Sequence, residues 1–258
     1  MGVTISIGAQ KGGIGKSSTT CILSFLLAEK GYKVLTVDFD SQGNTTEILS
    51  RRDIYSFEEE TVLNAIIDED PEKYIINVGE NLDLLPADDI LSTLTNRMYQ
   101  LRRYVPTSLK DTLEHIKDRY DFIIIDQPPN LGDLSVSALV ASDYVVVMLQ
   151  SEPLSFKAVP RYLRLVELVK TKISHDLNLA GILPSMSDTR TRIDSSIIEQ
   201  AREDYGDWVF DTVIKRRNRI KEFSLIGIQN NTKEDRDALE QYQLFLEELL
   251  HRVQKRTI

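Results

Sequence analysis

The chain has 258 residues and a formal net charge of −9, from 40 acidic and 31 basic side chains. This length suits one large α/β domain and allows a sizeable hydrophobic core. Because Cys21 is the only cysteine, the sequence excludes a disulfide framework and a thiolate metal site, and we expect a reducing, cytoplasmic environment. No apolar run approaches the ~18 residues that a membrane-spanning helix needs. The negative net charge argues against indiscriminate binding to nucleic acid.

A glycine-rich loop is predicted near the N-terminus, between an apolar strand at residues 3–7 and a helix over residues 16–30. Backbone N–H groups of such a loop, and the free N–H groups at the helix start, bind phosphate. In the pattern K-G-G-x-G-K-S, Lys16 should reach the β- and γ-phosphates of a nucleotide, and the Ser17 hydroxyl should hold Mg²⁺. The ordinary phosphate loop has a glycine in place of Gln10 and has no counterpart of Lys11. The predicted nucleotide-binding residues are Lys11, Gly12, Gly13, Ile14, Gly15, Lys16, Ser17 and Ser18.

Two acidic residues follow the next predicted strand, residues 33–37. Asp38 and Asp40 stand just past the carboxyl end of this strand, where open α/β sheets bind ligands. The residues that follow, Ser-Gln-Gly-Asn, also suit a plain turn with side-chain caps. The expected position beside the phosphate loop favours a functional role over a plain turn.

The region from residue 53 to residue 118 carries weaker signals. Apolar spacing favours helices over residues 55–68, 90–104 and 108–119, and a strand over residues 82–86. Arg97, Arg102 and Arg103 form a local basic group, for which a solvated helix face is favoured over a DNA contact.

A second diagnostic strand, residues 121–126, has apolar residues that end in Asp126. This is the Walker B pattern, in which the carboxylate emerges near the phosphate loop and can hold Mg²⁺, through water. Asp126 is therefore a candidate metal ligand, together with Asp38. Pro128 and Pro129 follow Gln127 and stiffen a loop that cannot be helical.

The remaining sequence continues the alternation of strands and helices. Strands are expected at residues 144–149, 179–184 and 209–214, and helices at residues 135–141, 155–171, 194–205 and 234–253. The alternation predicts right-handed crossovers and one α/β domain, residues 1–258, with a mostly parallel twisted sheet and helices on both faces. The last helix is expected to pack on the sheet.

A basic segment at residues 215–221 is the clearest charge asymmetry of this acidic chain. It holds five cations and no acid: Lys215, Arg216, Arg217, Arg219 and Lys221. For an isolated basic run, a solvated loop is the favoured interpretation, and binding to nucleic acid is the alternative.

These motifs resemble the deviant Walker A ATPases of the ParA/MinD family, which includes plasmid- and chromosome-partition proteins. The resemblance covers most of the chain. It begins at the loop at residues 11–18 and includes the D-x-P-P pattern at residues 126–129. Residues 38–46 are similar to the family's D-x-D-P-Q-G-N-x-T segment, with Ser41 in place of proline. The implied fold is that of a P-loop NTPase.

The resemblance also implies roles for individual residues. Asp40 would position or polarise the water that attacks ATP, and Lys11 would reach across a dimer to the phosphates of the other subunit. Lys11, Lys16 and Asp40 are thus the catalytic candidates. A switch that senses the γ-phosphate would comprise Asp40, Gln42, Asp126, Pro128 and Pro129.

The C-terminal segment from residue 188 to residue 222 resembles that of Soj-like members, in which two arginines contact DNA. They map to Arg190 and Arg219, and Lys215, Arg217 and Lys221 would add phosphate contacts. Lys215 and Arg217 replace a proline and an asparagine in a loop that also backs the adenine in the family. Arg216 of this loop is included among the nucleotide-binding candidates.

The resulting hypothesis is a Mg²⁺-dependent DNA-partition ATPase. Its ATP-bound homodimer would bind duplex DNA without sequence preference, and slow hydrolysis, stimulated by a centromere-binding ParB-type adaptor, would release it. The protein would be cytoplasmic and associated with the nucleoid when ATP is bound, with no membrane contact. Alternatives are a MinD-like positioning ATPase at the membrane, a nucleotide-gated adaptor that does not hydrolyse ATP, and, more distantly, a metabolic ligase.

Overall fold

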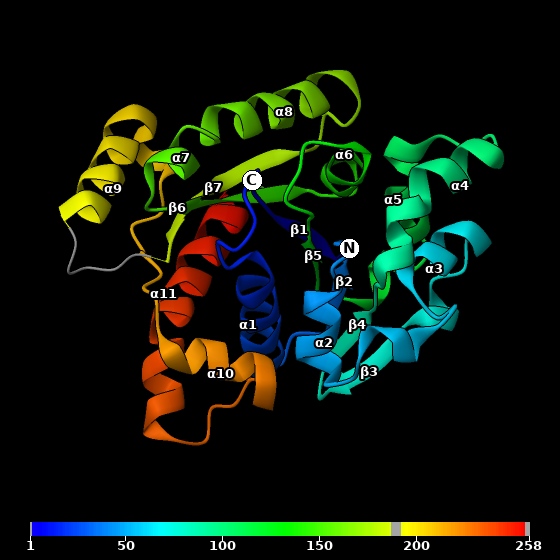
Figure 1. Cartoon of the computed structure of the whole chain (residues 1–258), viewed down its shortest axis with the longest axis horizontal. Coiled ribbons are helices and arrows are strands. Elements are labelled where there is room, and N and C mark those ends of the chain that lie inside the picture. The colour runs from blue at the N-terminus through cyan, green and yellow to red at the C-terminus, as the bar shows by residue number, and fades with distance from the viewer. Residues whose placement is uncertain (1, 187–191, 256–258) are drawn as a thin grey trace.

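Seven strands form one sheet among residues 2–186 and 192–255, which are the residues that this computed structural model describes (Figure 1). Their order is β3-β4-β2-β5-β1-β6-β7, and all neighbours are parallel except β3 and β4. The mostly parallel sheet that the sequence predicts is confirmed, with an antiparallel edge that it does not predict. The strands are β1 (Val3–Gly8), β2 (Val34–Asp38), β3 (Ile76–Gly79), β4 (Leu82–Leu85), β5 (Phe122–Asp126), β6 (Tyr144–Gln150) and β7 (Asn178–Ser185).

Helices follow the strands along the chain and cover the sheet (Figure 1). Within the described ranges, none is long and apolar enough to cross a membrane. Their bounds are α1 (Lys16–Glu29), α2 (Asn44–Ser50), α3 (Val62–Asp68), α4 (Leu94–Gln100), α5 (Val105–Glu114), α6 (Asp133–Val140), α7 (Pro153–Phe156), α8 (Val159–Lys172), α9 (Arg192–Tyr205), α10 (Asn218–Ile226) and α11 (Lys233–Lys255).

The core lies on both faces of the sheet, because successive side chains of a strand point to opposite faces. In β6, Val146 packs into a cluster with side chains of α1 and α11, whereas Val145 packs with side chains of α8. In β5, Ile124 belongs to the first of these faces, and Ile123 packs with α3 and α5. The strands are therefore apolar throughout, as expected for a parallel sheet covered on both sides.

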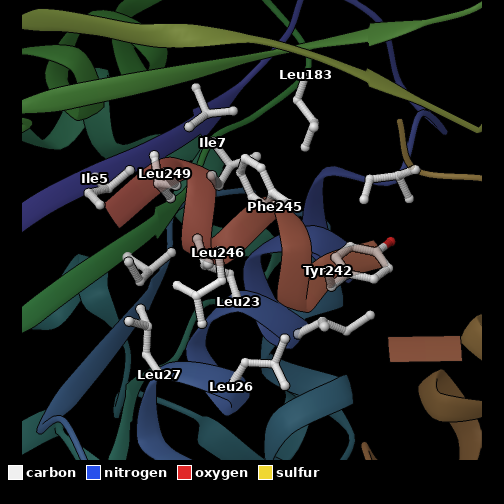
Figure 2. Packing of buried hydrophobic residues seen from close by; sticks show 14 of the residues in the cluster. Ile5, Ile7, Leu23, Leu26, Leu27, Leu183, Tyr242, Phe245, Leu246 and Leu249 are labelled. Carbon is white, nitrogen blue, oxygen red and sulfur yellow. The ribbon is translucent and has the colours of Figure 1, made fainter. Parts of the chain in front are cut away.

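The C-terminal helix packs on the sheet, as the sequence predicts. Figure 2 shows Phe245 and Leu249 of α11 among Ile7 of β1, Leu183 of β7 and Leu23 of α1. All five side chains are fully buried. Helix α11 thus fixes α1, which begins at the phosphate loop, against the central strands.

The expected strand over residues 209–214 is wrong. Val209 makes one isolated bridge, to Ile182 of β7. Glu248 of α11 accepts hydrogen bonds from the backbone N–H groups of Asp211 at 3.0 Å and Thr212 at 3.1 Å. Because a helix side chain satisfies these donors, the segment does not continue a strand ladder.

Several expected helices are shorter or divided. The helix expected at residues 55–68 is a 3-10 turn followed by α3, and Glu59 between them has a φ of 58°. The helix expected at residues 90–104 is a 3-10 turn followed by α4, which ends before Arg102 with a φ of 54°. The helix expected at residues 155–171 is divided into α7 and α8, and that expected at residues 108–119 is α5, which ends at Glu114.

Candidate nucleotide-binding site

The glycine-rich loop joins β1 to α1, as the sequence predicts, at the carboxyl edge of the sheet. Gly13 and Gly15 have φ values of 73° and 87°, which glycine adopts without steric cost. A Cβ at Gly13 would meet no atom within 4 Å, so this part of the loop is open. At Ile14 the loop is fixed, because Ser185 at the end of β7 donates a hydrogen bond to the Ile14 carbonyl at 3.1 Å.

Lys16 and Ser17 form the first turn of α1, where backbone N–H groups lack helical acceptors. The Lys16 side chain is almost fully buried. Its charge lowers the pKa of both Asp40 and Asp126, although burial raises the pKa of each carboxyl group overall. A buried cation and a row of free N–H groups together form a site for an anion.

Asp126 ends β5 beside this helix start. Burial raises the pKa of its carboxyl group, and the charge of Lys16 and hydrogen bonds from Ser17 and Thr45 oppose that rise. The Thr45 hydroxyl donates to Asp126 Oδ2 at 2.8 Å. Asp126 Oδ1 is buried and has no hydrogen-bond partner. One carboxylate oxygen of Asp126 is therefore left without a hydrogen bond within the chain.

The residues fit a Mg²⁺ ion of the kind held jointly by protein, water and phosphate. A free Asp126 oxygen and the Ser17 hydroxyl are hard oxygen donors of the type that Mg²⁺ prefers. Among the described residues, no group of three or more His, Cys, Asp or Glu side chains could hold a metal alone. This donor set matches an ion that depends on substrate phosphates for its remaining ligands.

Asp38 stands level with Asp126 on the neighbouring strand, but its oxygens are occupied. Oδ1 accepts from the backbone N–H of Asp40 at 3.2 Å, and Oδ2 accepts from the backbone N–H and hydroxyl of Thr46, at 2.7 and 2.8 Å. Burial, and then the charge of Asp126, raise the pKa of its carboxyl group. These contacts make Asp38 the anchor of the Asp40 turn and the start of α2.

Asp40 is also nearly buried and lies beside Lys16. Its Oδ1 accepts from the backbone N–H of Gln42 at 3.1 Å, which fixes the carboxylate within its own turn. Gln42 is exposed. The turn therefore presents a fixed carboxylate and a free carboxamide at the edge of the site.

Lys11 lies in a different environment from Lys16. Its ammonium group makes an ion pair with Glu152 Oε2 at 2.5 Å and contacts Gln150 Oε1 at 3.5 Å. About a third of the Lys11 side chain is exposed. The two lysines of the loop are thus separated, with one buried at the helix start and the other at the surface.

The prolines after Asp126 lie over the phosphate loop. A Cβ at Gly12 would be 3.9 Å from both Cβ and Cγ of Pro129. Pro128 is buried and Pro129 is half-buried. The proline loop and the phosphate loop are therefore neighbours at Pro129 and Gly12.

The basic segment follows Ile214, which lies beside the end of β7 at the same edge of the sheet. The backbone N–H of Ile214 donates to the Pro184 carbonyl at 2.9 Å, and Ile214 packs in one cluster with Ile14 of the phosphate loop. Lys215, Arg216 and Lys221 are exposed, and Arg217 is half-buried. From Asn218 onward this segment is helix α10 and not a loop.

Arg219 is engaged inside the chain. Its Nε donates to Asp235 Oδ1 at 2.7 Å, and Nη1 donates to Glu222 Oε2 at 2.5 Å. Asp235 in turn accepts from the backbone N–H of Thr232 at 2.9 Å, while the Thr232 hydroxyl accepts from the Asp235 N–H at 3.1 Å. This is a capping box at the start of α11, so Arg219 fastens α10 to that helix start. Arg190, the other predicted DNA contact, lies outside the described residues.

Sequence reasoning missed Thr45, Thr46 and Glu152. The two threonines follow Asp38 and Asp40 closely and fall in a recognised segment, so their spacing could have indicated them. Glu152 is 141 residues from Lys11 and stands in no motif. No signal in the sequence predicts that ion pair.

A parallel sheet, a phosphate loop with a helix start, and an Asp126 carboxylate at the next strand define a P-loop ATPase with a deviant Walker A loop. The AAA domain family model matches residues 2–179. The sporulation initiation inhibitor protein Soj of Bacillus subtilis is 38% identical over 86% of this chain and 87% of its own. The chromosome-partitioning ATPase Soj of Treponema pallidum is 31% identical over 88% of both chains.

The chain belongs to the AAA domain family and is one of its ParA-like partition ATPases. A solved structure agrees with the fold. Cobyrinic acid a,c-diamide synthase from Mycobacterium smegmatis, with bound ATP analog and magnesium, is 28% identical with a TM-score of 0.84. The match covers 97% of this chain and 94% of that chain.

Proposed function

We propose that this partition ATPase is a dimerisation switch, in which ATP joins two subunits and the dimer binds duplex DNA. The observation that carries the proposal is the separation of the two loop lysines. Lys16 is buried at the helix start, whereas Lys11 is partly exposed and held only by surface side chains. A partly exposed cation beside the phosphate site is available to a second subunit. Dimer contacts that depend on nucleotide phosphates give the differential affinity that a switch requires.

Hydrolysis in each subunit rests on residues that this chain brings together. Gly12, Gly13 and Gly15 let backbone N–H groups approach the phosphates, and Lys16 binds their oxygens. Ser17 and Asp126 would hold Mg²⁺, which would neutralise negative charge on the nucleotide phosphates. Asp40, fixed within its turn and influenced by Lys16, orients the attacking water.

The exposed cations of the basic segment supply the DNA contacts. Lys215, Arg216 and Lys221 are exposed on an acidic chain, and Ile214 lies at the same edge of the sheet as the phosphate loop. A dimer doubles this surface, so two weak contacts on one body gain from effective concentration. Contacts to phosphates carry no base information, and binding should be independent of sequence and weakened by salt.

The adaptor and the cellular location are part of this proposal and are supported by the names of the relatives. Relatives are named chromosome-partitioning ATPases, and the family resemblance implies a second protein that marks the DNA to be moved. We assign to this chain a centromere-binding ParB-type adaptor that stimulates hydrolysis. The ATP-bound dimer would then be associated with the nucleoid.

The membrane alternative finds little support in the C-terminal segment. Val253 is buried, and Arg252 donates hydrogen bonds to the backbone carbonyls of Trp208, Val209 and Ala180. These residues belong to the packed end of α11, and an interfacial helix needs its apolar face free.

The test is binding to a random-sequence duplex without nucleotide, with ADP, with ATP and with a slowly hydrolysed ATP analogue, at two salt concentrations. We expect salt-sensitive binding only with ATP or the analogue. Equal binding in all four states, or none in any, would remove DNA from the mechanism, and flotation with liposomes would then test the membrane alternative.

Two lysine variants sharpen this test. Lys221→Ala should weaken binding to every duplex equally and reduce the magnitude of the slope of log K against log salt by about 0.9 for each subunit of the dimer. Lys172→Ala is the matched control, because this exposed lysine ends α8 before β7 begins, at the opposite edge of the sheet. Equal effects of both variants would show that charge in general, and not this surface, sets the affinity.

A further inference from the structure

Beneath the phosphate loop, a buried hydrogen bond joins the loop after Asp126 to helix α8. The Tyr162 hydroxyl donates to Gln127 Oε1 at 2.5 Å, and both side chains are fully buried. Burial raises the pKa of the Tyr162 phenol, so the group remains a donor throughout the physiological range. Neither residue belongs to the ATP-binding or hydrolytic residues described above.

This pair also contacts the strand from which the phosphate loop begins. A Cβ at Gly8 would lie 1.8 Å from the Tyr162 hydroxyl oxygen and 2.9 Å from Gln127 Oε1. The backbone N–H of Gln127 donates to the Ile7 carbonyl at 3.2 Å. The ends of β1 and β5 and the side of α8 therefore meet at the Gln127 carboxamide.

Two buried polar atoms in this region, one donor and one acceptor, make no hydrogen bond. Gln127 Nε2 is a donor without an acceptor, and Gln10 Oε1 is an acceptor without a donor. Gln10 belongs to the phosphate loop, and it lines one small cavity together with Tyr162. An unpaired buried donor and an unpaired buried acceptor are both unfavourable, and a hydrogen bond between them would remove both penalties.

We propose that Gln127 is a positioning residue for nucleotide binding. Tyr162 fixes its carboxamide, and its free N–H group pairs with the Gln10 side-chain carbonyl when the phosphate loop closes on a nucleotide. The closed loop is thereby tied to the segment that holds Asp126 on one side and Pro129 on the other. Because Pro129 lies over Gly12, the same contact sets the height of the proline loop above the phosphates.

The test is a double-mutant cycle with isosteric variants. Gln10→Met and Gln127→Met keep the side-chain volume and remove hydrogen bonding. We measure thermal midpoints without nucleotide and the affinity for a slowly hydrolysed ATP analogue. Gln10→Met should not lower the midpoint, because Gln10 Oε1 has no partner in this structure. Each single variant should weaken analogue binding roughly 3- to 10-fold, the loss expected for one hydrogen bond.

The double variant should bind the analogue no more weakly than the single variant that has the lower affinity, since both changes remove the same contact. Multiplicative losses in the double variant, or unchanged affinity in Gln10→Met, would overturn the proposal. Tyr162→Phe should also weaken binding, because Gln127 loses its anchor. Tyr144→Phe is the matched control, since its buried hydroxyl donates to the Val253 carbonyl at 3.2 Å, far along α11. Equal losses of affinity in the two tyrosine variants would contradict the specific role of Tyr162.

Discussion

The Lys11 ammonium group lies 2.5 Å from a Glu152 carboxylate oxygen of the same chain. Glu152 immediately precedes α7, so the ion pair holds the lysine against its own subunit. In the proposed dimer, Lys11 would have to leave this carboxylate before it could reach the phosphates of a second subunit. The Glu152 side chain is about half exposed, and an exposed ion pair contributes only about 0–1 kcal/mol. The pair would therefore weaken the proposed dimer slightly without preventing it.

Replacing Glu152 by glutamine should strengthen the ATP-dependent dimer. The change removes the attraction that holds Lys11 in its own subunit, so the dimer dissociation constant should fall by up to about fivefold for each of the two pairs. The measurement is sedimentation equilibrium with the slowly hydrolysed ATP analogue. Glu72→Gln is the control, because Glu72 makes an ion pair with Arg119 that faces away from the loop. A weaker Glu152→Gln dimer would show that Glu152 itself contributes to the interface.

Changing each of the two loop lysines to alanine should affect nucleotide binding differently. Lys16→Ala removes the buried cation at the helix start and should abolish nucleotide binding. Lys11→Ala should keep nucleotide binding by the monomer within about threefold, because its ammonium group contacts surface side chains. Fluorescent-nucleotide titration below the dimerisation concentration distinguishes the two. Equal loss of binding in both variants would place Lys11 in the nucleotide site of its own subunit.

Local motifs in the sequence predicted the phosphate loop and the Asp126 strand, because each depends on a few consecutive residues. Contacts between distant residues could not be predicted. The Glu152 ion pair and the Tyr162 hydrogen bond join positions 141 and 35 residues apart, and no local motif indicates the partner in either pair. The wrong strand at residues 209–214 has the same cause, since Glu248 of α11 takes the backbone donors.

The role predicted for Arg219 changes for a similar reason. A basic run indicates exposed charge, but it does not reveal acids that lie near it only in the fold. Asp235 is 16 residues further on and binds this guanidinium, while Lys215 and Lys221 stay exposed. Arg219→Ala should therefore lower the thermal midpoint, and reduced DNA binding by that variant would not by itself identify a DNA contact.

Thr46→Val should destabilise the folded protein. The Thr46 hydroxyl donates to Asp38 Oδ2 at 2.8 Å and accepts from the backbone N–H of Ala87 at 2.8 Å. Valine leaves the Ala87 donor buried without an acceptor, which costs about 1–3 kcal/mol. Urea unfolding measures this loss, and Thr171→Val on the exposed face of α8 serves as control. A Thr46→Val loss no larger than the control would contradict the anchoring role of this hydroxyl.

Stability should fall in acid partly through Asp235. Hydrogen bonds from Thr232, and then the Arg219 guanidinium, lower the pKa of this carboxyl group to about 2. A depressed carboxyl pKa stabilises the fold above the unfolded value of about 4, and this contribution is lost as pH falls towards 2. Asp235→Asn should lower the thermal midpoint at neutral pH and flatten its dependence between about pH 4 and about pH 2. A variant with the same acid dependence as the wild type would contradict this assignment.

The most direct test of the proposed switch is the mass of the protein in solution with ATP and with ADP, measured by light scattering. The wild type and Asp40→Ala should be dimers with ATP and monomers with ADP, and Asp40→Ala should stay dimeric longer because it does not hydrolyse the nucleotide. Lys11→Ala should be a monomer in both. An identical mass for the wild type with ATP and with ADP would contradict the central claim that ATP joins two subunits.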